Sequence, residues 1–356
     1  MSHPSSVVVP RSASYRRAVV LFWLGVLIAA VMLFWSLRGV AWVDLHKALL
    51  GAKWQWLLVA WGLMGCSMGM RALRWATLFP PSLGLGGRTV FAPMMVGYLF
   101  NLLLPGRMGE LVRSVALAKQ TQKPASGILA TIVVERLVDA LLMVLFAVVW
   151  WVTFRPEFSG GAGIGILAVG LVAVLCALVV IWAEVMWVDR LIRSILRVFP
   201  TKLSELIWRL YLHFREGLRS MADVRQLGRF LGITLLIWSV EWVTLSCLLW
   251  TFSLSLQPLE VAFLLAAVAL GSALLPAPGQ VGTFQFFAIQ AATLLGVQKT
   301  TATGFALVWH AAVFSTLALL GLGALLWLRR RWATWMWSLD ISNNPTDVEK
   351  KDQEVT

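Results

Sequence analysis

The chain has 356 residues, of which 59% are hydrophobic and 13% are charged. Soluble domains are about half apolar and a quarter charged, so this composition argues against a soluble enzyme and predicts a membrane protein. The formal net charge of +13 does not indicate a nucleic-acid-binding domain, because the Lys and Arg residues lie in short stretches beside long apolar segments.

Six segments are long and apolar enough to cross the hydrocarbon core of a bilayer, which takes about 20 helical residues. They are residues 18–37, 54–72, 125–152, 161–187, 230–251 and 303–328. The first of them follows a basic tail, residues 1–17, as a signal peptide would. It is long enough to span and has no persuasive cleavage site, so we expect an uncleaved first helix.

Two further apolar stretches are interrupted by Pro and Gly. The first covers residues 89–119, with a break at Pro105 and Gly106, and the second covers residues 260–295, with a break from Pro276 to Gly279. A break inside a membrane leaves backbone groups unpaired, which is tolerable only within protein or beside a watery cavity. We therefore expect two re-entrant hairpins.

The basic clusters predict the orientation, because positive charge stays on the cytoplasmic side of a membrane. These clusters lie at residues 11–17, 71–88, 189–229 and 329–331. Keeping all of them cytoplasmic returns the first hairpin to the cytoplasmic side and places the second on the outer side. We expect a multi-pass protein of the plasma membrane or cell inner membrane, with both termini cytoplasmic.

The two breaks share a sequence pattern, Pro-Gly-x-x-Gly, and begin 173 residues apart at Pro105 and Pro278. The same shift carries the helix at 54–72 onto the one at 230–251, with the opposite orientation. Transporters often contain such inverted repeats, whose broken helices meet at a central site. The fold prediction is an all-α polytopic membrane protein with about six full transmembrane helices plus two re-entrant broken-helix hairpins arranged as an inverted repeat.

The chain divides accordingly into two membrane repeats, residues 18–152 and 153–330. The second contains the segment 189–229, in which apolar residues recur at helical spacing from Leu203 to Leu218. This pattern predicts an amphipathic helix on the cytoplasmic surface, either a connector or a lipid sensor. Residues 331–356 become polar and are expected to form a largely disordered tail.

Charged side chains within the apolar segments are the best candidates for a site, since a charge in a bilayer is costly unless it is paired or faces a cavity. Glu135 and Asp139 share a helix face, and Arg136 points about 100° away from them. The candidate substrate-binding residues are Arg107, Glu110, Arg113, Glu135, Arg136, Asp139, Asn101, Gln285 and Glu241. The residues that form the breaks are Pro105, Gly106, Gly109, Pro276, Pro278, Gly279 and Gly282.

These charges fit two interpretations equally well. They could lock the first hairpin to the next helix, or they could clamp a phosphate, because Arg offers a planar fork of donors. Asn101 and Gln285, beside the breaks, could bind substrate, although satisfying freed backbone groups is the default. His310 is expected to be packed or hydrogen-bonded. We predict no catalytic residue, metal or cofactor, because the sequence contains no metal-ligand spacing, nucleophile elbow or phosphate-binding loop.

The run from Asn101 to Arg113, followed by Thr131-x-x-x-Glu135-Arg136-x-x-Asp139, resembles the signature of the lysylphosphatidylglycerol synthase transmembrane, or flippase-like, family. The run from Leu275 to Gln285 is similar to its second signature, except that Gln285 stands where many relatives have Glu. The resemblance covers residues 18–330 and implies a membrane module that moves or handles lipids. The family's polar motif positions fall on Arg107, Glu110, Arg113, Glu135, Arg136 and Asp139.

The resemblance and the charges together favour a transporter rather than an enzyme. We expect a translocator of an anionic or polyprenyl-phosphate-linked lipid, with the headgroup near Arg107 and Arg113. The alternatives are a membrane-embedded transferase with Glu110, Glu135 or Asp139 as base, and a non-catalytic scaffold of a lipid-synthesis complex. The expected partners are membrane lipids and lipid- or glycan-synthesis enzymes, not nucleic acid. Nothing after Ser338 could fold into the soluble domain of the synthases, so synthase activity is not expected.

Overall fold

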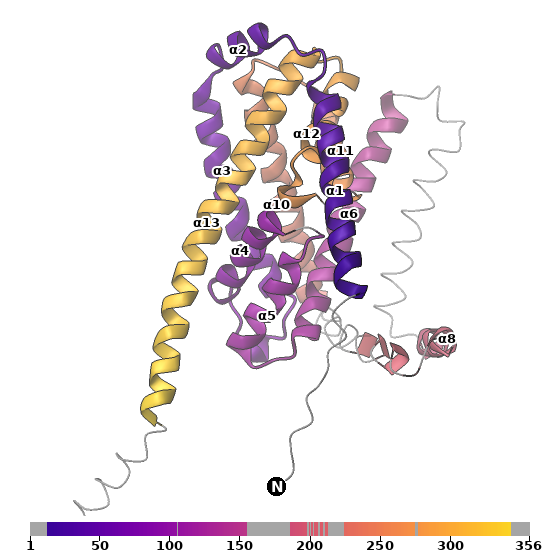
Figure 1. Cartoon of the computed structure of the whole chain (residues 1–356), viewed down its shortest axis with the longest axis vertical. Helices are drawn as coiled ribbons and strands as arrows, with labels where there is room; N and C mark the ends of the chain where they lie inside the picture. Colours follow the sequence, from indigo (N-terminus) through magenta and orange to yellow (C-terminus); the bar gives the residue numbers. More distant parts are fainter. Residues whose placement is uncertain are drawn as a thin grey trace, which may run out of the picture.

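The computed structural model describes residues 13–104, 106–154, 186–197, 224–274 and 277–342, with isolated residues and short runs between 199 and 212. Every regular element in these ranges is helical (Figure 1). The α-helices are α1 (Ala13–Leu37), α2 (Trp42–Leu50), α3 (Trp54–Ala76), α4 (Gly87–Leu103), α5 (Gly109–Thr121), α6 (Ala125–Phe154), α8 (Met186–Leu196), α10 (Val224–Thr251), α11 (Pro258–Leu274), α12 (Thr283–Leu294) and α13 (Lys299–Ser342). Single 3-10 turns form η1 (Pro81–Leu83) and η4 (Pro278–Gln280).

Three helices in the described part of the chain are long and apolar enough to cross a membrane alone: Trp54–Ala76, Arg225–Thr251 and Lys299–Arg330. A fourth candidate is the pair Gly25–Leu37 and Trp42–Leu50, which is bent by 84°. These helices confirm three predicted spans and agree with a multi-pass membrane protein, and the first predicted span, residues 18–37, overlaps the bent pair. The span predicted at 125–152 forms α6, which carries three charged residues in its first half and is not among these candidates. The span predicted at 161–187 lies outside the described residues except at its end.

Both interrupted stretches fold as two helices that pack against each other, α4 on α5 and α11 on α12. Glycine allows the close approach in the first pair. A Cβ added to Gly109 would collide with the Gly97 carbonyl oxygen, and one added to Gly97 would collide with the Arg113 side chain. In the second pair, Gly271 lies against the ring of Phe287. Small residues at these contacts therefore fold each broken helix back on itself.

The two breaks share a pair of left-handed residues. Gly106 and Arg107 have φ of 66° and 56°, and Gly279 and Gln280 have φ of 58° and 57°. These values lie in the left-handed region, which glycine adopts freely and other residues adopt at a cost. The shared Pro-Gly-x-x-Gly pattern thus corresponds to a shared left-handed pair, in which a residue with a long side chain follows the glycine. The next residue is helical in the first break, at Met108, and extended in the second, at Val281.

Each broken pair lies in its own half of the bundle. Figure 1 shows α4 and α5 in the lower half and α11 and α12 in the upper half, with α3 and α10 running through both. Helix α3 packs along α10, while α13 packs on α4 and α6 packs on α11. One buried apolar cluster surrounds the first pair and a second surrounds the other. The polar site lies where the two halves meet.

Three features of the fold differ from expectation or extend it. Helix α13 is described as far as Ser342, so it enters the segment 331–356 that is predicted to be a largely disordered tail, and the rest of that segment lies outside the described residues. The chain after α1 forms a short helix, α2, which the sequence did not single out. Of the segment 189–229, the structure describes most of α8 and the start of α10, and most of the amphipathic pattern from 203 to 218 lies outside the described residues.

Candidate functional site

A buried cluster of two arginines and two carboxylates joins α3, α5 and α6. Arg74 donates to both oxygens of Asp139, at 2.6 and 2.9 Å, and its Nε lies 3.5 Å from Glu135 Oε1. Arg113 Nη2 donates to the other Glu135 oxygen at 2.7 Å. Glu135 and Asp139 both reach Arg74 because residues four apart share a helix face. The cluster contains two charges of each sign and is neutral.

Aromatic side chains complete this cluster and extend it to α10. The Arg113 guanidinium lies 3.6 Å from the ring centroid of Trp75, which donates to Thr131 Oγ1 at 2.9 Å. Trp238 on α10 donates to Asp139 Oδ1 at 3.1 Å. Arg113 therefore has its Nη2 in an ion pair and its face against an aromatic ring, and its side chain is buried away from both cavities. A guanidinium held in this way fixes the hairpin to α6 and is not available to a ligand.

A second ion pair joins α3 to α10. Arg71 Nη2 donates to Glu241 Oε1 at 2.8 Å, and Ser67 Oγ donates to the same oxygen at 2.6 Å. Both charged side chains also line the main cavity of the molecule. This pair crosses the contact between the two long helices that run through both halves.

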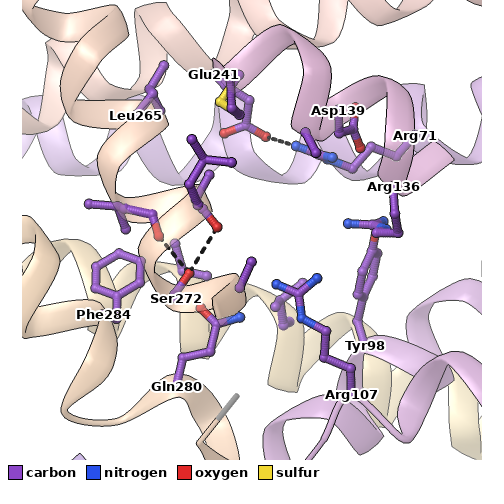
Figure 2. Close-up of a pocket in the computed structure, with 18 of the residues that line it drawn as sticks. Arg71, Tyr98, Arg107, Arg136, Asp139, Glu241, Leu265, Ser272, Gln280 and Phe284 are labelled. Atoms are coloured by element: carbon purple, nitrogen blue, oxygen red, sulfur yellow. Dashed lines mark hydrogen bonds and ion pairs between the residues drawn. The ribbon is translucent and has the colours of Figure 1, made fainter. Parts of the chain in front are cut away.

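The main cavity has a volume of about 630 Å³ and lies between the two breaks, with walls from α3, α6, α10, α11 and α13 (Figure 2). Its charged lining consists of Arg71, Arg107, Glu110, Arg136, Asp139 and Glu241. Much of the remaining wall is apolar and includes Met64, Met68, Met143, Leu265, Val268 and Trp309. The cavity is thus amphipathic, with charged groups gathered on part of an apolar wall.

Two arginines of the cavity are held loosely. Arg136 donates to the Tyr98 hydroxyl at 3.1 Å, and its Nε lies 3.7 Å from Glu110 Oε1. The guanidinium of Arg107 forms no hydrogen bond or ion pair with any described residue. Figure 2 shows it extending into the cavity beside Arg136. Cations that face a cavity without a close partner can bind an anion.

A smaller cavity of about 140 Å³ adjoins the first and shares Tyr98, Arg107, Glu110, Arg136 and Gln280 with it. Asn101 lines this smaller cavity, and its buried Oδ1 has no hydrogen-bond partner among the described residues. A buried polar atom without a partner is unusual in folded proteins and marks a place where a ligand or water completes the bonding. The polar lining therefore continues past Arg107 toward α4.

The family described as Lysylphosphatidylglycerol synthase TM region matches residues 22–321. The chain belongs to this family. The matched region contains both breaks and every charged residue of the cluster and the cavity, which confirms the resemblance predicted from the two signatures. No curated protein and no solved structure matches the chain.

The charged signature residues of this family member separate into two layers. Arg107, Glu110, Arg136 and Asp139 line the main cavity, as does Glu241 from outside that signature. Arg113 and Glu135 do not line it, because they are paired with each other behind it. Of the two arginines expected near a headgroup, Arg107 lines the cavity and Arg113 does not. Arg136 faces the cavity in place of Arg113, since the face of α6 that carries Glu135 and Asp139 is turned toward Arg74.

Gln285 has a partner for each end of its side chain and does not line either cavity. Its Oε1 accepts from the Gly282 N–H at 2.8 Å, and its Nε2 lies 2.7 Å from His310 Nδ1. His310 Nε2 lies 2.9 Å from the Gly279 carbonyl oxygen, which can only accept, so Nε2 donates and Nδ1 accepts. Gln285 and His310 thus satisfy backbone groups freed by the second break, as the default interpretation of Gln285 held.

Sequence reasoning missed four residues of the site. Arg71 and Arg74 were interpreted as orientation signals, but their spacing of three residues beside an apolar helix face was a sign that they point inward together. No sequence pattern pointed to Tyr98 as a site residue. Gln280 follows Pro278-Gly279 as Arg107 follows Pro105-Gly106, so the repeat itself pointed to it.

Proposed function

We propose that this chain binds the anionic headgroup of a membrane lipid, or of a lipid-linked molecule, and moves it between the two leaflets. The observation that carries the proposal is the guanidinium of Arg107, which has no hydrogen bond or ion pair among the described residues, in a cavity whose other charges have partners. A charge in a membrane interior is costly unless something compensates for it. A phosphate offers the compensation that the described residues do not.

The headgroup would lie between Arg107 and Arg136, with the Tyr98 hydroxyl as a further donor. The separation of 3.7 Å between Arg136 and Glu110 is too long for a strong hydrogen bond, so a phosphate can compete for Arg136. Glu135 and Asp139 are held by arginines and serve to keep α3, α5 and α6 in place. One group of charged residues would thus bind the headgroup, and the other would hold the helices that carry the binding residues in place.

The apolar wall would hold the part of the lipid next to its headgroup. Met64, Met68 and Met143 contribute flexible, polarisable side chains to that wall, which can adapt to chains of different shape. Binding sites for small molecules combine such apolar walls with a few well-placed polar groups. The chains of the lipid need not fit inside the cavity for the headgroup to reach it.

The two halves would act as an inverted repeat, with the broken helices re-entering the membrane from opposite sides. The shared left-handed turn at the two breaks supports this arrangement. The packing supports it too, because exchange of the halves carries the contact of α13 with α4 onto that of α6 with α11. In such repeats, rocking of one half against the other exposes a central site alternately to each side.

The proposal is tested by the lipids that the protein retains and moves. We would compare the wild type with Arg107→Ala, and with Arg88→Ala as a control, since Arg88 is an exposed arginine that lines neither cavity. Mass spectrometry of lipids co-purified in mild detergent should show an anionic class that is enriched in the wild type and the control and lost in Arg107→Ala. Translocation in reconstituted vesicles should follow the same order.

The outcomes separate the competing functions. Equal lipid content and equal translocation in all three proteins would remove Arg107 from the site. Chemical turnover of a lipid-phosphate donor by the purified wild type would replace translocation with a transferase activity.

A further inference from the structure

The two breaks place one side chain each at equivalent positions in the cavity. Arg107 and Gln280 both follow a Pro-Gly pair, have φ of 56° and 57°, and line both cavities. Figure 2 shows the two side chains extending into the cavity toward each other. The side-chain amide of Gln280 forms no hydrogen bond with any described residue. One break therefore presents a cation, and the other presents a neutral group that can donate and accept.

The charges around the cavity leave one positive charge without a counterpart. The described charges that line the cavity are three arginines and three carboxylates, and the chain of ion pairs from Asp139 through Arg74 and Glu135 to Arg113 brings the total to five arginines and four carboxylates. They are Arg71, Arg74, Arg107, Arg113 and Arg136, and Glu110, Glu135, Asp139 and Glu241. Interactions between charges are strong in a cavity walled by apolar groups. A ligand with a single negative charge neutralises this site, whereas a dianion or a zwitterion leaves a net charge behind.

We propose that Gln280 sets the charge of the substrate: the cavity selects a phosphodiester headgroup with one net negative charge over a dianionic phosphomonoester and over a zwitterion. This inference rests on the proposed function and names the residue that determines which headgroup charge the cavity accepts. An arginine at position 280 would supply a second cation opposite Arg107, as the symmetry of the breaks permits. The neutral amide binds a headgroup oxygen or hydroxyl and adds no charge.

The decisive variant is Gln280→Arg. Arg107 already shows that an arginine adopts this left-handed conformation at the equivalent place, so the backbone can accept the change. The double variant Arg107→Gln/Gln280→Arg exchanges the two groups and keeps the net charge of the site. Gln280→Met removes the amide while leaving the charge and the length of the side chain nearly unchanged.

The measurement is a competition for the full-length protein in nanodiscs of zwitterionic phosphatidylcholine. The competing lipids are phosphatidylglycerol, a phosphodiester with one charge, and phosphatidic acid, a phosphomonoester. At about pH 8 the phosphomonoester is close to doubly charged, because the second pKa of a phosphate monoester is about 6. The ratio of the two lipids retained after transfer to detergent is counted by mass spectrometry, and the thermal unfolding midpoint of each variant confirms that it is folded.

The wild type should retain the monoanion in preference to both other classes, and Gln280→Arg should shift the ratio toward the phosphomonoester by about tenfold. The exchange variant should regain the preference for the monoanion, and Gln280→Met should bind less lipid with the order unchanged. An unaltered ratio in folded Gln280→Arg would overturn the role of Gln280 while leaving anionic-lipid binding intact. Absence of any enrichment of anionic lipid in the wild type would instead overturn the proposed function itself.

Discussion

The first break, at residues 105–109, and the second, at 278–282, share a pair of left-handed residues but have opposite surroundings. The first is surrounded by arginines and carboxylates joined in ion pairs. The second is held by neutral groups, a chain from the Gly279 carbonyl oxygen through His310 and Gln285 to the Gly282 N–H. Where α6 carries Glu135 and Asp139, α13 carries Val308 and Ala312 at the corresponding positions.

This difference shows that the residues that shape the backbone around the cavity are not the residues that give the cavity its charge. Pro, Gly and small packing residues produce the turn in both halves, so the backbone does not depend on charge. Apart from Glu241 on α10, the charges of the site come from the first repeat, where they supply both a rigid support and a cation without a partner among the described residues. A duplicated backbone can in this way hold an asymmetric site, charged on one side and neutral on the other.

The largest expected effect comes from breaking the charged support. Glu135→Ala should destabilise the protein by about 3 to 5 kcal/mol, because it leaves the buried Arg113 without its partner and weakens the hold on Arg74. The measurement is the free energy of unfolding in mild detergent. Val308→Ala, at the corresponding position of the second half, is the control and should cost much less. Equal losses at the two positions would contradict the view that only the first break depends on charge.

A smaller effect is expected from breaking the neutral chain. Gln285→Ala should destabilise the protein by about 1 to 3 kcal/mol, since it leaves the buried Gly282 N–H without an acceptor and His310 Nδ1 without a donor. The same unfolding measurement applies. The order of lipid preference should be unchanged, because Gln285 lines neither cavity. A change in lipid order with stability preserved would return Gln285 to the binding site.

The smallest effect tests the shared turn. Asn adopts the left-handed conformation more readily than Arg or Gln, so Arg107→Asn and Gln280→Asn should each stabilise the protein by at most about 1 kcal/mol, and by similar amounts. Their lipid binding should differ, because only Arg107→Asn removes the free cation. Unequal changes in unfolding free energy would show that the two turns carry different strain.

Local patterns in the sequence were enough for the membrane class, the helices, the two breaks and the family. Hydrophobic length predicts helices because the bilayer demands internal hydrogen bonding, and Pro-Gly pairs predict breaks because they act on the adjoining backbone. The shared face of Glu135 and Asp139 followed from helix geometry alone. The Pro-Gly-x-x-Gly repeat contains the position of Gln280, although Gln285, a few residues further on, was the predicted site residue.

Only the tertiary structure decided which charges are paired and which are free. Arg74 meets Asp139 from 65 residues away, and Arg71 meets Glu241 from 170 residues away. No local pattern predicts such partners, because they depend on how α3 packs against α6 and α10. The sequence by itself determined that this is a membrane protein of broken and unbroken helices with charges near its first break. The packing decided that Arg113 pairs with Glu135 behind the cavity, whereas Arg136 and Arg107 face it. A buried charge without a partner is strongly destabilising in a medium of low polarity, so the buried arginines are the ones that are paired.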